Sequence, residues 1–133
     1  MKLKLIMLVS LIAFGFAATA NAGDVSDGDT DLVPDGFDNC DAAANGPNEG
    51  SNQVDTDTDG YGNACDADYD NDLAVTAADF GIFLGTFGGT GDLTDHDGDT
   101  SITAADFGVF LGQFGGSPGT SGLPCAGTAG CTP

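Results

Sequence analysis

The chain has 133 residues and a formal net charge of −19, because 21 acidic residues are opposed by only 2 basic ones. Both basic residues, Lys2 and Lys4, lie at the amino terminus. The rest of the chain has no Lys or Arg to neutralise nucleic-acid phosphates or an anionic membrane surface, so the composition excludes both as electrostatic partners.

Residues 1–22 have the pattern of a secretory signal peptide: a basic start, an apolar run from Leu5 to Ala18, and a small-x-small cleavage site at Ala20-Asn21-Ala22. Its removal leaves 111 residues that keep all 21 acidic groups and neither lysine, so the charge becomes about −21. We expect a secreted protein, extracellular or at the cell surface, with no membrane insertion after cleavage. Modules of this size usually need metal ions or disulfides for stability.

Most of the acidic residues follow one spacing. Of the 20 Asp, 17 fall into four twelve-residue loops with oxygen-bearing side chains at positions 1, 3, 5, 9 and 12. The predicted ligands are Asp27, Asp29, Asp31, Asp35 and Asp38 in loop 1; Asp55, Asp57, Asp59, Asn63 and Asp66 in loop 2; Asp68, Asp70, Asp72, Thr76 and Asp79 in loop 3; and Asp95, Asp97, Asp99, Thr103 and Asp106 in loop 4. A disordered acidic segment is the alternative for such a charge run, but disorder does not require a register repeated four times.

Calcium is the cofactor that this spacing favours. It binds six to eight oxygens, and a twelve-residue loop with these side chains and a carbonyl at position 7 can surround it. Magnesium prefers a tighter octahedron and keeps its waters, whereas transition metals prefer the imidazole or thiolate groups that these ligand sets lack.

Each of the last two loops runs into a segment with helical periodicity, at 79–89 and 106–116. Apolar residues recur at i, i+3, i+4 and i+7: Phe80, Phe83, Leu84 and Phe87, then Phe107, Phe110, Leu111 and Phe114. We predict two helices that begin inside their loops, end at Gly-Gly pairs and pack against each other as a pseudo-twofold pair. The interior glycines suggest close contact between the helices: Gly81, Gly85, Gly108 and Gly112.

Residues 67–116, two loop-plus-helix units 27 residues apart with Asp79 and Asp106 at position 12, resemble a dockerin. This family has two EF-hand-like calcium loops, each followed only by its exiting helix. The chain departs from the family at position 6, where Leu73 and Thr100 replace the usual Gly. The resemblance implies calcium-dependent docking onto a cohesin-type protein partner through the exposed helix faces.

Residues 24–68 resemble a pair of thrombospondin type 3 repeats, and we assign 23–66 to this module. The motifs that carry the resemblance are Asp27-x-Asp29-x-Asp31, Asp38-Asn39-Cys40, Asn45-Gly46-Pro47-Asn48, and Asp55-x-Asp57-x-Asp59-Gly60-x-Gly62-Asn63-x-Cys65-Asp66. In that family, carboxylates attach calcium ions to a chain with almost no apolar core, and the two cysteines form a disulfide.

The four cysteines, an even number in a chain with an export signal, predict disulfides. Sequence alone allows three pairings; the resemblance favours Cys40 with Cys65, and the six-residue spacing favours Cys125 with Cys131. A structural zinc site is the alternative, but the chain has no Cys-x-x-Cys pair and only one His. The last segment, 117–133, reads as a flexible Gly/Ser/Thr/Pro tail with a small disulfide loop.

The expected fold class is therefore a small protein stabilised by metal and disulfides: calcium-wired irregular loops followed by a mostly α, two-helix EF-hand pair. We expect that the protein is not an enzyme, because His96 at position 2 of loop 4 should point outward and no Ser or Cys nucleophile has a plausible catalytic partner. The predicted function is calcium-dependent docking in a polysaccharide-degrading or cell-surface assembly. The alternative is a structural or adhesive matrix component that calcium stiffens, crosslinks or self-associates.

Overall fold

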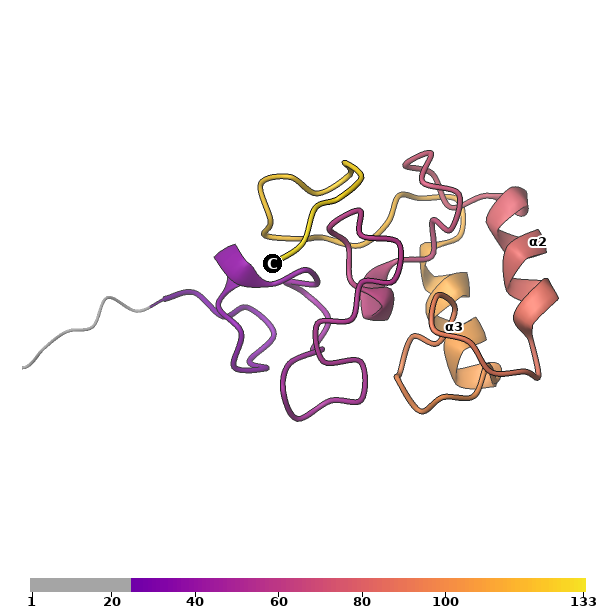
Figure 1. Cartoon of the computed structure of the whole chain (residues 1–133), viewed down its shortest axis with the longest axis horizontal. Helices are drawn as coiled ribbons and strands as arrows, with labels where there is room; N and C mark the ends of the chain where they lie inside the picture. The colour runs from indigo at the N-terminus through magenta and orange to yellow at the C-terminus, as the bar shows by residue number, and fades with distance from the viewer. Residues whose placement is uncertain (1–24) are drawn as a thin grey trace, which may run out of the picture.

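The computed structural model describes residues 25–133, so the predicted signal peptide and cleavage site lie outside the described residues. These residues contain two α-helices, α2 (Ala77–Thr86) and α3 (Ala104–Gln113), and two short 3-10 helices, η1 (Asp35–Phe37) and η2 (Asn63–Cys65). The helices α2 and α3 lie at one end, and irregular loops form the other (Figure 1). Across residues 25–133, neither helix is long and apolar enough to cross a membrane.

Both helices begin inside their loops, at position 10, as the sequence predicts. The residue before each helix, Thr76 or Thr103, caps it: the hydroxyl oxygen accepts a hydrogen bond from the backbone N–H of the second helical residue. The carboxylate three residues further on, Asp79 or Asp106, accepts in return from the backbone N–H of the capping threonine at 2.7 Å. Such a capping box satisfies backbone donors that a helix start leaves unpaired.

Both helices end at the predicted Gly-Gly pairs, which also join the two units. Gly88 and Gly115 adopt φ values of +81° and +84°, a conformation that glycine reaches without a steric penalty. Gly115 donates its N–H to the carbonyl of Val75 at 2.8 Å, and Gly88 donates to that of Ile102 at 2.9 Å. The end of each helix is thus bound to position 8 of the other unit's loop.

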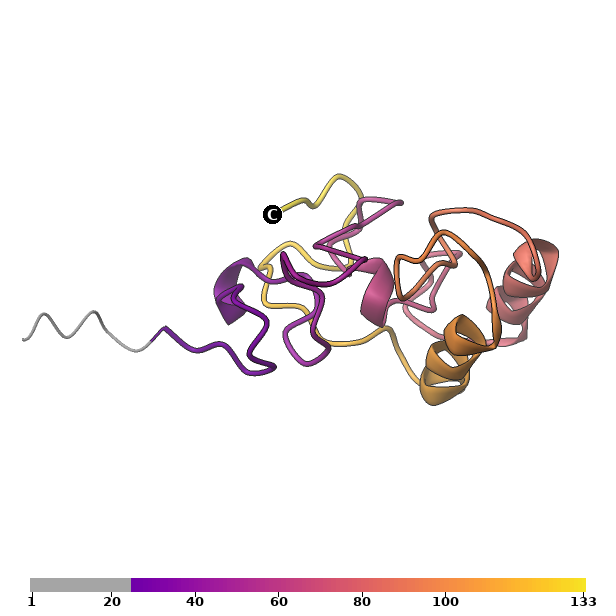
Figure 2. The same cartoon turned by 90° about the horizontal axis from the view of Figure 1, so that it is seen from below.

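The predicted pairing of the two helices is confirmed by an aromatic core. Phe83 and Phe110 are fully buried, with their ring centroids 5.6 Å apart, and Phe80 stacks on Phe107 at 6.0 Å. The turned view in Figure 2 shows the two helices as neighbours. Ala67, Tyr69, Val75 and Ile102 complete the buried cluster.

One detail of the helix prediction is wrong: the interior glycines do not mark close helix contact. A Cβ built on Gly81, Gly85, Gly108 or Gly112 would meet no atom within 4 Å beyond the backbone of its own helix. The apolar stripes are only partly covered, because two short helices cover only one side of each other; four side chains remain half-exposed, namely Leu84, Phe87, Leu111 and Phe114.

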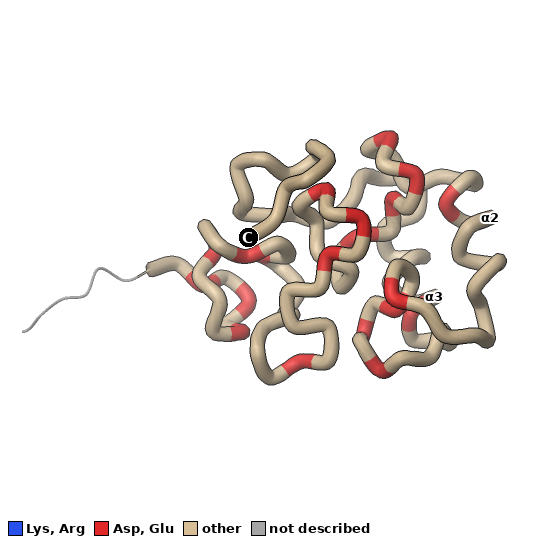
Figure 3. The backbone as a smooth tube through the Cα atoms, in the orientation of Figure 1, with Lys and Arg blue, Asp and Glu red and all other residues tan. Residues whose placement is uncertain are grey.

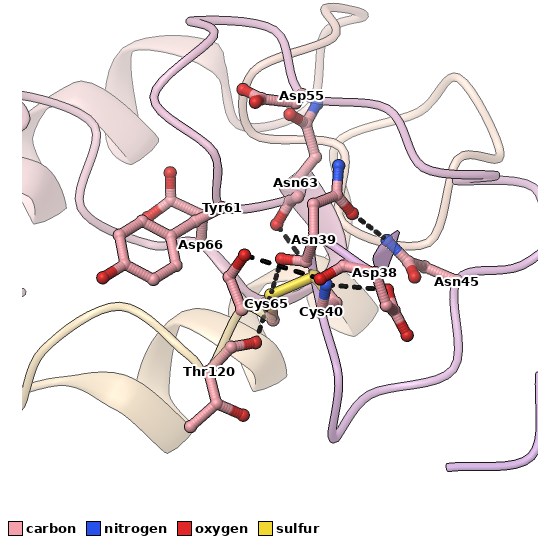
Figure 4. Close-up of a disulfide and its surroundings, with 12 residues drawn as sticks. Asp38, Asn39, Cys40, Asn45, Asp55, Tyr61, Asn63, Cys65, Asp66 and Thr120 are labelled. Atoms are coloured by element: carbon pink, nitrogen blue, oxygen red, sulfur yellow. Dashed lines mark hydrogen bonds between the residues drawn. A yellow bond between two sulfur atoms is a disulfide. The ribbon is translucent and has the colours of Figure 1, made fainter. Parts of the chain in front are cut away.

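The first half of the described chain has a polar interior. Asn39 and Asn45 are completely buried, and the Asn45 amide donates to the side-chain oxygen of Asn39 at 2.7 Å. The Gln53 amide donates to the side-chain oxygens of both Asn45, at 2.6 Å, and Asp38, at 2.7 Å. Figure 4 shows Asn39 and Asn45 on one side of the Cys40–Cys65 disulfide. The hydrogen bonds of these amides take the place of the contacts that an apolar core would make.

Both favoured disulfides, Cys40–Cys65 and Cys125–Cys131, are present. The segment 117–133 differs from the expected free, flexible tail, because it runs back along the first half (Figure 1). Its backbone is hydrogen-bonded there: Gly119 donates to Cys65 at 2.7 Å, Gly122 to Asp38 at 2.9 Å and Gly127 to Asp59 at 2.8 Å. Composition alone did not reveal these partners, which lie 54 to 84 residues earlier in the chain.

Candidate metal sites

Each of the four predicted loops brings three carboxylates together, with ligand atoms within 4.8 Å of one another. Loops 1, 2 and 3 use positions 1, 3 and 5, whereas loop 4 uses positions 1, 3 and 12. The clusters are Asp27, Asp29 and Asp31; Asp55, Asp57 and Asp59; Asp68, Asp70 and Asp72; and Asp95, Asp97 and Asp106. Figure 3 shows the acidic residues distributed along the loops, with no Lys or Arg among the described residues. These clusters could hold metal ions.

The four loops also share one backbone shape. Positions 4 and 6 have positive φ in every loop, including the non-glycine residues Leu32 (81°), Leu73 (66°) and Thr100 (73°) at position 6. The carboxylate at position 1 accepts the N–H of position 6 in each loop, for example from Leu73 to Asp68 at 2.6 Å. The carboxylate at position 5 accepts a hydrogen bond from the backbone N–H of position 7 in each loop. Each loop therefore curls around its own carboxylates, even where glycine is missing.

Positions 9 and 12 have more varied partners. At position 9, Asp35 and Asn63 accept hydrogen bonds from the N–H of position 2 at 2.7 and 2.9 Å, while Thr76 and Thr103 serve as helix caps. At position 12, only Asp106 joins a three-carboxylate cluster. The other three hydrogen-bond to nearby backbone: Asp38 to Cys40, Asp66 to Asp68, and Asp79 to Asp70 and Thr76.

Buried oxygen atoms without a hydrogen-bond partner support metal binding in loops 1 and 2. Such an atom is costly unless something pairs with it. Within residues 25–133, the Oδ2 atoms of Asp29, Asp38, Asp57 and Asp59 are in this state, and the Asp38 and Asp59 side chains are 0% and 3% exposed. A cation would satisfy these oxygens, so the residues present fit a bound metal. Glu49 has the fifth such atom and was not among the predicted ligands.

Burial and neighbouring carboxylates raise the pKa values of two acidic groups in loop 2. Burial, followed by the neighbouring carboxylates Asp59 and Asp55, raises the pKa of Asp57 to about 6. Burial and the nearby Asp59, Asp57 and Asp68 raise the pKa of Asp66 to about 8. Without a cation the Asp66 carboxyl keeps its proton near neutral pH, whereas the Asp57 carboxyl keeps its proton only below about pH 6. A bound cation would displace both protons.

Asp106 behaves differently. Although burial opposes ionisation, backbone N–H groups of Thr103 and His96 donate to its carboxylate and lower its pKa. Hydrogen bonds from the backbone therefore stabilise the ionised form of Asp106, the form that binds a cation.

The expectation that His96 points outward is wrong. Its side chain is only 2% exposed, and both ring nitrogens have partners: Nε2 lies 2.8 Å from the Tyr69 hydroxyl, and Nδ1 contacts the carbonyl oxygen of Asn63. A signal was present in the sequence, because Tyr69 and His96 both occupy position 2 of their loops, 27 residues apart. The buried Asn39, Asn45 and Gln53 are the other residues that site prediction missed.

The fold and sites define a small, disulfide-bonded, two-helix protein with acidic clusters able to hold metal ions, and its disulfides indicate an oxidising, extracellular environment. No family model, curated protein or solved structure matches the chain.

Proposed function

We propose that this protein is a secreted calcium-binding module whose helix pair docks onto a partner protein. The observation that supports the proposal most is the fourfold loop, in which one backbone shape and at least three clustered carboxylates recur at Asp27, Asp55, Asp68 and Asp95. The resemblances to thrombospondin type 3 repeats and to dockerins support the calcium-binding and docking parts of the proposal. The signal-peptide pattern supports secretion.

The donor chemistry favours calcium over other ions. The clusters offer only oxygen atoms, which hard cations prefer, and the loops present further oxygens at positions 9 and 12 for the high coordination number of calcium. Three carboxylates within 4.8 Å repel one another. A divalent ion in each loop would remove this repulsion and reduce the charge of the mature chain from about −21 to about −13.

A docking face lies on the helix pair. We define it as the six side chains Phe80, Leu84, Phe87, Phe107, Leu111 and Phe114. They line two entirely apolar pockets of about 170 and 180 Å³, which share the Phe80–Phe107 stack and are equivalent under the 27-residue repeat. Each pocket has room for one large apolar side chain of a partner. A contiguous group of exposed apolar side chains is a common feature of interaction sites.

Calcium binding is tested by isothermal calorimetry on the mature chain with both disulfides intact. We expect four ions, and Asp68→Asn should remove one of them because it exchanges the position 1 carboxylate of loop 3. The matched control is Asp92→Asn, an exposed Asp outside the four ligand sets, which should leave the count unchanged. A chain that binds no calcium, or whose count is the same for both variants, would contradict the proposal.

Docking is tested by calcium-dependent capture from the surface fraction of the exporting cell, followed by reconstitution with the purified captured protein. We expect a one-to-one complex that is lost in chelator and weakened at least tenfold by the double substitution Leu84→Ser and Leu111→Ser. These side chains are each 55% exposed, so their replacement should spare the fold. Calcium-driven self-association without a partner would instead favour the structural or adhesive matrix function.

A further inference from the structure

His96 occupies a junction of three loops that sequence analysis assigned to two separate modules. It belongs to loop 4, its ring contacts the Asn63 carbonyl in loop 2, and it contacts the Tyr69 hydroxyl in loop 3. Tyr69 in turn stacks on Phe110 in the aromatic core, with centroids 6.1 Å apart.

The two ring contacts fix how the imidazole is protonated. A backbone carbonyl only accepts, so Nδ1 of His96 must carry the proton that it donates to Asn63. In the neutral ring Nε2 is then an acceptor, and the hydroxyl of Tyr69 donates to it. Both hydrogen bonds are buried, and losing either would leave an unpaired polar group in the interior.

The same residue also holds a ligand of loop 4. The backbone N–H of His96 donates to Oδ1 of Asp106 at 2.8 Å, and Asp106 is one of the three clustered carboxylates of that loop. Asn63 is itself the position 9 residue of loop 2, where its Oδ1 accepts the N–H of Thr56 at 2.9 Å. A continuous path therefore leads from loop 2, through the Asn63 carbonyl and His96, to Asp106.

Further contacts press loop 4 against the first module. The Asn63 side-chain amide donates to the carbonyl of Asp92 at 2.6 Å. Gly50 and Gly98 meet backbone to backbone, since a Cβ on Gly98 would overlap the carbonyl carbon of Gly50. The interface leaves no room for a side chain at this point. The two modules are therefore packed against each other and are not independent domains joined by a flexible linker.

We propose that His96 is a positioning residue that couples the metal sites of loops 2 and 4, so that calcium in either loop strengthens binding in the other. This inference rests on the proposed calcium binding. Ordering loop 2 fixes the Asn63 carbonyl, which holds the His96 ring and hence the backbone N–H that orients Asp106. Coupling free energies of this kind change affinity by about 5-fold to 150-fold.

A calcium titration followed by amide NMR tests the coupling one site at a time. The N–H of Gly60 donates to Asp55 in loop 2, and that of Gly98 donates to Asp95 in loop 4, so each reports its own site. Asp55→Asn should weaken the affinity reported at Gly98 by at least about fivefold. Asp27→Asn removes the equivalent carboxylate of loop 1 and should change it less than about twofold, because no hydrogen bond of His96 reaches loop 1.

Variants of His96 then test the route. His96→Phe keeps an aromatic ring but loses the donor, so Asp55→Asn should no longer affect Gly98 in that background. His96→Asn can present its amide near the position of Nδ1 and should retain coupling. If His96→Phe does not fold, Asp95→Asn in the otherwise unchanged chain must still weaken the affinity reported at Gly60.

Two results would overturn the inference: Asp55→Asn leaves Gly98 unaffected in the unchanged chain, or it weakens Gly98 equally with and without the imidazole. The failure of calcium binding itself is a different result, because neither Gly60 nor Gly98 would then respond to calcium in the unchanged protein.

Discussion

The two halves of the molecule support the same twelve-residue loop in different ways. In residues 25–66 the only buried apolar side chains are the disulfide cysteines, Cys40 and Cys65, and the interior consists mainly of amides and carboxylates. In residues 67–116 the loops enclose an aromatic core around Phe83 and Phe110. Loop shape is nevertheless the same in both halves, down to the positive φ at positions 4 and 6.

This difference shows that the loop defines its own shape through local hydrogen bonds, from position 6 to position 1 and from position 7 to position 5. The interior that supports the loop, polar in one half and aromatic in the other, determines how much stability remains when no cation neutralises the carboxylates. An aromatic core stabilises the fold whether or not calcium is bound. The polar interior of the first half contributes little apolar burial to offset the repulsion between carboxylates. The halves should therefore depend unequally on calcium.

Removing calcium gives the largest expected effect. At pH 7.5 without calcium, the amide of Gly62, bonded to the Asn39 carbonyl, should exchange at the rate of an unfolded chain, while that of Phe87, bonded to Phe83 beside the aromatic core, keeps some protection. Helical circular dichroism should fall as well, because ten-residue helices are marginal alone. Hydrogen exchange measures the contrast, and equal loss of protection in both halves would remove the distinction between them.

Acid should partly reverse that loss. The folded pKa values of about 8 for Asp66 and about 6 for Asp57 lie above the ordinary value of 3.8. Through these two groups the calcium-free fold binds more protons than the unfolded chain, so their contribution to stability is greatest below pH 3.8 and is lost as pH rises towards 8. Gly62 protection in calcium-free protein should increase between pH 8 and pH 5. Asp66→Asn should flatten this dependence; an unchanged profile would assign the effect to other groups.

Truncation in the aromatic core should affect the second half most. Phe110 is 1% exposed and packs against Phe80, Phe83 and Phe107, so Phe110→Ala should lower the free energy of unfolding by about 3–5 kcal/mol. Urea unfolding in saturating calcium measures the loss. Phe114→Ala, at a position 52% exposed, is the matched control and should cost much less. Similar costs for both variants would show that Phe114 is also covered in solution.

The polar interior predicts a smaller loss in the first half. Asn45→Ala removes an amide that bonds Asn39 and Gln53 and leaves buried groups unpaired, at a cost of about 1–3 kcal/mol. The same urea experiment measures it, with the exposed Asn52→Ala as control. A neutral Asn45→Ala would mean that the amide network is not what holds this half together.

Local features of this fold could be predicted from the sequence, whereas contacts between distant segments could not. Register and turn residues placed the four loops, the helix starts at Thr76 and Thr103 and the helix ends at the Gly-Gly pairs, because neighbouring residues decide each of them. Burial of His96 depends on Asn63 and Tyr69, 33 and 27 residues away. Periodicity identified the apolar face of each helix but not how much of it a single short partner helix can cover.

The smallest expected effect concerns the interior glycines, where sequence and structure disagree most directly. If Gly81 lay in a tight helix contact, a methyl group there would clash; in the structure such a group would meet no atom within 4 Å beyond the backbone of its own helix. Gly81→Ala should therefore stabilise the protein by about 0.5–1 kcal/mol, because alanine loses less backbone entropy in a helix. The opposite control is Gly98→Ala, where φ is +70° and a Cβ would strike Gly50. Urea unfolding in saturating calcium should move the two midpoints in opposite directions; destabilisation by Gly81→Ala would mean that the helices approach more closely in solution.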